Sequence, residues 1–270
     1  MFKDIVKVFK ENIDYIIKNR KDNVFTYAIY LFLRLFVFVS LINNLINGTY
    51  ESAFMCFFVL ILFLLPLLIE KNFKIKLPSV LESIILFFIF GSLILGEING
   101  FYEKVPLWDS LLHFVNGFIC AAVGFSLVDI LNQNSKFKYE LSPIFIVVLS
   151  FSFSMTIGVL WEIFEFSVDM LLKTDMQKDT IIHNIFSVKI TPDGSVGGIQ
   201  NIDNVTIDGY ELPLQGYLDI GLIDTMKDLI VNIIGAILFS IFGYFYIKKR
   251  GKKSFACNFI PVLKNEDFKS

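Results

Sequence analysis

The chain has 270 residues, of which 55% are hydrophobic and 16% aromatic, and its formal net charge is −2. Its mean hydropathy of +0.64 lies well above that of soluble domains, and several apolar runs reach the roughly 20 residues that cross a bilayer. An ordinary soluble domain is therefore excluded. We predict an all-α, polytopic membrane protein whose main partner is the lipid bilayer, and we expect no nucleic-acid partner.

Residues 1–23 are predicted to form an amphipathic helix on the inner membrane surface, because apolar residues and lysines fall on opposite sides. Six transmembrane helices should follow within a domain spanning 24–247. Their predicted ranges are 24–46, 52–69, 80–98, 108–131, 143–172 and 224–247. Residues 248–270 form a basic tail.

Lysine and arginine cluster in residues 1–23, in the loops after the second and fourth spans, and in the tail. Basic residues mark the cytoplasmic side of a membrane protein. We therefore predict a bacterial inner-membrane protein with both termini in the cytoplasm and an extracytoplasmic segment at 173–223. In that segment Asp193-Gly194 and Asp208-Gly209 are turn signals between short β-prone runs, which predicts one or two small β-hairpins.

The fifth span ends in three acidic residues, Glu162, Glu165 and Asp169, which lie within about 60° of one another on a helix. Carboxylates are costly in lipid and need a pore, a cation, a proton or a protein interior. On the predicted topology, acids at the outer ends of other spans reach the same level, whereas the inner halves of these spans are mostly apolar apart from hydroxyls. Those outer residues are Glu97, Asp109, His113, Asp224 and Asp228.

Carboxylates with one imidazole can bind a divalent cation, share protons, or serve as general acid and base. The metal-ligand candidates are Asp109, His113, Glu165, Asp169, Asp224 and Asp228. The catalytic candidates are His113, Glu162, Glu165 and Asp228. A structural alternative is that Asp109 and Asp224, each near the N-terminus of a span, only cap their helices.

Three functions follow from this pattern. The first is an enzyme or binding site that acts on a cation-dependent or lipid-linked envelope substrate. The second is a transporter or channel for a cation or proton, which should carry polar residues through the whole membrane. The third is a structural membrane subunit. The sequence names neither the substrate nor the metal nor the oligomeric state.

The ordered motifs Gly96-Glu97, Trp108 to His113, Trp161 to Glu165, Met176-Gln177 and Gly221 to Asp228 resemble the YjdF-type family of bacterial inner-membrane proteins. This resemblance covers roughly residues 77–246 and implies a topology and a membrane location. A fainter similarity to VanZ-like membrane proteins is carried by Asp109 with His113 and by Asp228 with Asn232 and Gly235. It implies a link to envelope chemistry.

Overall fold

The computed structural model describes residues 24–73, 75–133, 141–249 and 255–263. This part of the chain holds 6 helical segments that are long and apolar enough to cross a membrane. They are Thr26–Ile46, Tyr50–Asn72, Ser79–Ile98, Trp108–Asn132, Pro143–Leu172 and Leu222–Lys248. The predicted all-α, six-span fold is confirmed, whereas the amphipathic helix predicted at 1–23 lies outside the described residues.

The chain divides into two compact units. The first consists of residues 1–157 and 231–270, and the second of residues 158–230. The helices α8 (Pro143–Leu172) and α9 (Leu222–Lys248) each contribute one part to the first unit and one part to the second.

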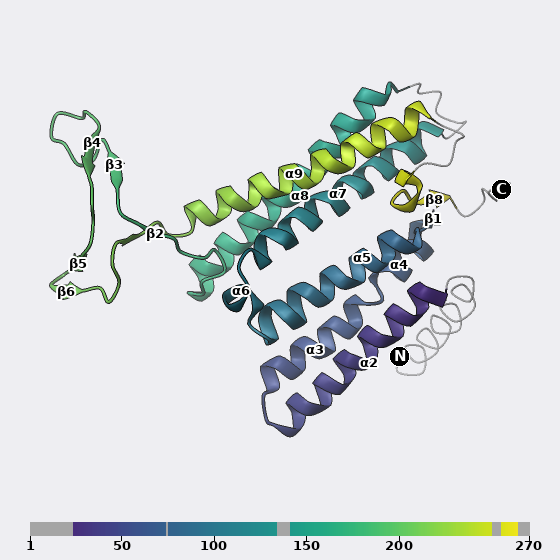
Figure 1. Ribbon diagram of the computed structural model, residues 1–270, viewed down its shortest axis with the longest axis horizontal. Helices are drawn as coiled ribbons and strands as arrows, with labels where there is room; N and C mark the ends of the chain where they lie inside the picture. The colour runs from purple at the N-terminus through teal and green to yellow at the C-terminus, as the bar shows by residue number, and fades with distance from the viewer. Residues whose placement is uncertain (1–23, 74, 134–140, 250–254, 264–270) are drawn as a thin grey trace. The chain divides into compact units, whose positions relative to one another are not determined.

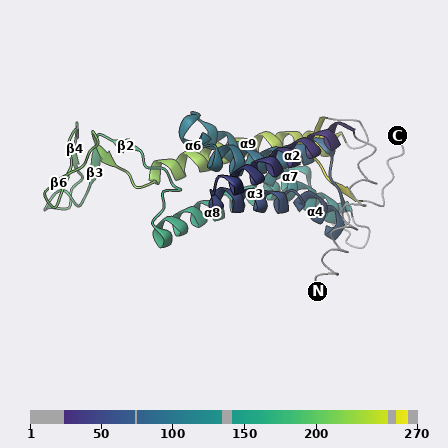
Figure 2. The ribbon, with the colours of Figure 1, turned by 90° about the horizontal axis from the view of Figure 1, so that it is seen from below.

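In the first unit, α2 (Val24–Ile46) packs along α3 (Tyr50–Leu62), and the two helices run side by side in both views (Figure 1, Figure 2). The second span is interrupted between α3 and α4 (Leu65–Phe73). Pro66 has no backbone N–H to donate, and the amide of Leu64 bonds to the Ile61 carbonyl in a tighter turn. Proline therefore accounts for the break in this span.

The third span changes its helical type. It begins as the α-helix α5 (Ser79–Ile89) and continues as the π-helix η1 (Phe90–Ile98). The backbone and side-chain amides of Asn99 both donate to the Ile94 carbonyl, at 3.0 and 2.8 Å. The Trp108 indole donates to the Gly91 carbonyl at 3.2 Å, which links this span to α7 (Trp108–Gln133) across the short helix α6 (Phe101–Lys104).

Small residues allow α7 and α9 to pack backbone to backbone. A Cβ atom on Gly117 would lie 2.2 Å from the Asn232 carbonyl oxygen, and one on Gly235 would lie 2.1 Å from that of Phe114. Small residues allow such close approach between membrane helices. Further along, Phe125 packs against Tyr246, so the two helices run parallel.

The first half of α8 packs antiparallel to α7 through two buried hydroxyls. Ser150 Oγ donates to the Ala121 carbonyl at 2.6 Å, and Ser154 Oγ donates to the Gly117 carbonyl at 2.8 Å. A step of four residues forward on α8 is thus matched by a step of four residues back on α7. These two bonds define the register of the pair.

Part of the predicted basic tail packs against the bundle. The short helix η2 (Phe255–Asn258) is followed by β8 (Val262–Leu263), which pairs antiparallel with β1 (Ile75–Lys76). Between them, the ring of Phe259 lies 5.1 Å from that of Phe118, and both Phe259 and Ile260 are buried. These apolar side chains leave water by entering the helical core.

The second unit carries short antiparallel strand pairs, as predicted. β5 (Thr206–Ile207) and β6 (Tyr210–Glu211) form a hairpin around Asp208-Gly209, both of which have positive φ angles. That conformation is the one a two-residue hairpin turn needs. β3 (Ile185–Ser187) pairs with β4 (Gly197–Ile199), and β2 (Ile181–Ile182) pairs with β7 (Tyr217–Leu218).

Candidate functional site

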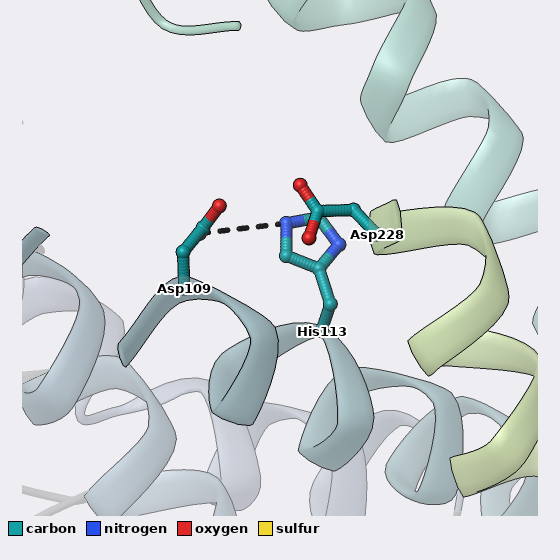
Figure 3. Close-up of side chains that lie close together, drawn as sticks. All are labelled: Asp109, His113 and Asp228. Atoms are coloured by element: carbon teal, nitrogen blue, oxygen red, sulfur yellow. Dashed lines mark ion pairs between the residues drawn. The ribbon is translucent and has the colours of Figure 1, made fainter. Parts of the chain in front are cut away.

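The first unit carries an aspartate–histidine pair at the start of α7. Residues four apart on a helix are neighbours, and His113 Nε2 lies 3.6 Å from Asp109 Oδ1 (Figure 3). The imidazole is buried, with 8% of its side chain exposed, whereas the Asp109 side chain is 33% exposed. A carboxylate beside one ring nitrogen orients the imidazole.

One turn further into the bundle lies a layer of amide and sulfur groups. Asn116 Nδ2 donates to Asn232 Oδ1 at 3.3 Å, and the Cys120 thiol donates to Asn116 Oδ1 at 3.5 Å. Asn232 Nδ2 contacts the Met155 sulfur at 3.7 Å, and the Asn232 side chain is fully buried. Asn116 is absent from the predicted site. Its position three residues after His113, on the same helical face, is the signal that could have found it.

The second unit carries two buried glutamates on α8. Glu162 and Glu165 are 5% and 8% exposed, although their neighbours Ile163 and Phe164 are exposed. The Trp161 indole donates to Glu165 Oε1 at 2.8 Å, which orients that carboxylate. Buried carboxylates in a membrane span are costly, so this helical face is the one turned toward protein.

Asp228, labelled on α9 in Figure 3, is 2% exposed and is the most deeply buried acid of the second unit. Its neighbours in sequence, Lys227 and Leu229, are more accessible than Asp228. Like Glu162 and Glu165, it is a predicted site residue that the fold buries.

Two other predicted metal ligands accept hydrogen bonds from backbone amides. Both oxygens of Asp169 are used: Oδ1 accepts from Met176 N at 2.7 Å and Oδ2 from Gln177 N at 2.8 Å. Asp224 Oδ2 accepts from Lys178 N at 2.9 Å. These carboxylates fasten the segment after α8 to the start of α9, which is a structural task. Glu97 is exposed on η1.

A residue that the sequence did not single out, Asp219, caps α9. Its carboxylate accepts from Thr180 N at 2.7 Å and from Ile223 N at 2.6 Å. Burial acts to raise the pKa of Asp219, but these backbone donors, with that of Gly221, outweigh burial and hold the pKa below its ordinary value. Asp219 therefore does the capping that the sequence suggested for Asp224.

Two further carboxylates are buried near the ends of the spans that lie away from Asp109 and His113. Glu82 lies in the first turn of α5 and is 7% exposed, and Asp129 lies near the end of α7 and is 2% exposed. The inner halves were predicted to be mostly apolar apart from hydroxyls, and these two buried carboxylates are exceptions to that pattern. A single charge within an apolar run does not break the run, so hydropathy gives such residues little weight.

Comparison with known proteins assigns the family. Residues 27–249 match the family described as "Predicted membrane protein (DUF2238)". The chain belongs to this family. It is also 31% identical over 127 residues to an uncharacterized protein of Thermotoga maritima, a match that covers 46% of this chain and 64% of the relative. No solved structure matches the chain. Neither match carries the YjdF or VanZ name, so both resemblances stay predictions.

Proposed function

We propose that α7, α8 and α9 converge on one buried divalent-cation site, formed by Asp109, His113, Glu162, Glu165 and Asp228. The observation that carries the proposal is the register of α8 and α9 on α7 within the first unit. Because a helix is a rigid rod over a few turns, that register can be extended from the packed residues to the acidic ones.

For α8, the Ser150–Ala121 and Ser154–Gly117 hydrogen bonds set the register. Two further turns along α8 from Ser154 lead to Glu162, and two turns back along α7 from Gly117 lead to Asp109. Extending the antiparallel register would bring the α8 glutamates to the level of the aspartate–histidine pair.

For α9, the contact of Gly117 with the Asn232 carbonyl sets the level. One turn back along α9 leads to Asp228, and one turn back along α7 leads to His113. In the proposed arrangement His113 is shared by two sets of ligands, each with an imidazole and two carboxylates. One set is Asp109, His113 and Asp228, and the other is His113, Glu162 and Glu165.

The ligand types favour a first-row divalent cation. Carboxylates and one imidazole projecting inward from facing helices are a common donor set of bundle-core metal sites. Several carboxylates buried close together repel one another and are costly to desolvate. A divalent cation bound among them would offset both the repulsion and the desolvation. A purely structural role for these acids would offset neither.

We propose that the site faces the outside of a bacterial inner membrane and acts on a phosphate-bearing, lipid-linked envelope substrate. The basic residues support the orientation, and the β1–β8 pair needs the loop after α4 and the C-terminal segment on one side of the membrane. A bound cation would polarise a phosphate or activate water. Glu162, Glu165 and His113 would move protons, because they are buried beside it.

Metal content tests the proposal. Detergent-purified protein is incubated with excess Zn²⁺, Mn²⁺ or Mg²⁺, desalted, and measured by mass spectrometry of the elements. We expect one equivalent of metal, and at least about tenfold weaker binding in His113→Ala, Glu165→Ala and Asp228→Ala. Glu103→Ala, an exposed acid near the start of α7, is the matched control. Wild-type protein that retains no metal would refute the cation site and leave a proton-sharing carboxylate network.

A cation or proton transporter is the second candidate. It is favoured by Glu82 and Asp129, which are buried at the ends of α5 and α7 that lie away from Asp109 and His113. A transport path needs water access from both sides. Cysteines introduced at Thr156, Gly158 and Asn232 are labelled with an impermeant thiol reagent from each face. Labelling from the outside alone supports the one-sided site, and labelling from the cytoplasm supports transport.

A further inference from the structure

An apolar groove of about 490 Å³ runs between the start of α8 and the end of α9, entirely within the first unit. Its walls include Val148 and Phe151 of α8 with Ile237, Ile241 and Tyr244 of α9. The size is that of a small-molecule pocket, and the lining suits a hydrocarbon chain. Its lining residues lie at least nine positions along α8 and α9 from the acidic residues of the candidate site.

One serine lies in this apolar lining. Ser240 is 7% exposed, and its hydroxyl has no hydrogen-bond partner among the residues that the structure describes. The buried hydroxyls of Ser126, Ser150 and Ser154, by contrast, each donate to a backbone carbonyl. The Ser240 hydroxyl is itself covered, so the open surface of the groove is apolar throughout.

Positive charge gathers at the mouth of the groove. Lys248 Nζ lies 4.7 Å from the centre of the Tyr244 ring, and Tyr244 itself lines the groove. The ammonium therefore lies next to one wall residue of the groove. Lys249 is exposed beside it, and α8 begins at the same end of the groove, where a helix N-terminus favours negative charge.

We propose that this groove binds one anionic phospholipid. An acyl chain fills the space between the apolar walls, and Lys248 and Lys249 bind the phosphate. Basic side chains beside a cleft between spans are typical of anionic-lipid sites.

Native mass spectrometry of the full chain in mild detergent tests the proposal with phosphatidylglycerol and phosphatidylcholine of the same acyl chains. We expect one retained phosphatidylglycerol, and about a fivefold loss of its preference over phosphatidylcholine for each lysine removed in Lys248→Gln and Lys249→Gln. Lys173→Gln, at the far end of α8, is the matched control. Equal retention of the two lipids by the wild-type protein would overturn the proposal.

The groove itself is tested separately by filling it. Ile241→Trp should abolish retention of both lipids, because the larger side chain occupies the space of the acyl chain. Ile241 is 48% exposed, so the substitution should not disturb the helical core. If that variant does not fold, Val148→Phe, also half-exposed, makes the same test. Unchanged phosphatidylglycerol binding in a folded, groove-filled variant would contradict the site.

Discussion

Replacing Gly235 with alanine should destabilise the protein, because the two backbones already touch at this position. The added Cβ would lie 2.1 Å from the Phe114 carbonyl oxygen and 3.0 Å from the Phe118 nitrogen. The first distance is more than roughly 1 Å short of ordinary van der Waals contact, so α9 must move away from α7. Overpacking of this kind costs about 1–3 kcal/mol, and the higher helix propensity of alanine returns up to about 1 kcal/mol.

The measurement is thermal unfolding of the purified protein in detergent. A net loss of about 1–2 kcal/mol should lower Tm by about 2–8 °C for a chain of this size. Gly243→Ala is the matched control on the same helix, because its Cβ would meet only the ring of Phe125, at 2.8 Å, and a ring can turn aside. Equal Tm values for wild type and Gly235→Ala, or a larger loss in Gly243→Ala, would refute the reasoning.

The cap formed by Asp219 should be lost in acid. The pKa of Asp219 is lower in the folded protein, so its stabilisation is complete above the unfolded pKa of about 4 and disappears as pH falls through the folded pKa. Pepsin cleavage of residues 173–223 should therefore rise over that pH range. An unchanged pH profile of cleavage in Asp219→Asn would contradict this. Asp179 behaves oppositely, because burial and the charges of Asp175 and Asp219 raise its pKa. Asp179→Asn should therefore have a higher Tm than the wild type at pH 7 and lose this advantage in acid, which a pH series of melting curves would show. Equal Tm values of the two proteins at pH 7 would count against the charge repulsion. Trp161→Phe removes the donor to Glu165 and should cost about 1–3 kcal/mol in unfolding free energy, unlike Trp108→Phe, whose partner is a neutral carbonyl.

Hydropathy located all six spans to within a few residues, because the need to cover about 30 Å of hydrocarbon acts on each helix separately. The turn dipeptide Asp208-Gly209 likewise predicted its hairpin, since a tight turn depends on two residues. The break of the second span at Pro66 was readable in principle, whereas nothing in the sequence of the third span indicates the π-helix η1. The burial of Phe259 and Ile260 inside a basic tail was equally hidden, because it depends on the space that other helices leave.

The Asp109–His113 pair could be predicted because both partners lie on one helix, four residues apart. Other polar residues are related only through long-range contacts. Asn116 and Asn232 are 116 residues apart in the chain, and Asp219 binds an amide 39 residues away. The sequence could not tell which carboxylates bind backbone amides and which are buried, because Asp169 and Asp228 both recur at helical spacing with other acids.

The sequence by itself determined the membrane class, the number of spans and the local pairing on α7, since each follows from the periodicity or the hydropathy of one segment. Only the tertiary structure decided that Asp169, Asp219 and Asp224 hold the connection between α8 and α9. It also decided that Gly117 and Gly235 let α7 and α9 touch and that Ser240 lines a groove. The physical reason is that hydrogen bonds and packing join groups that are distant in the chain, and a residue type states its bonding capacity but not its partner.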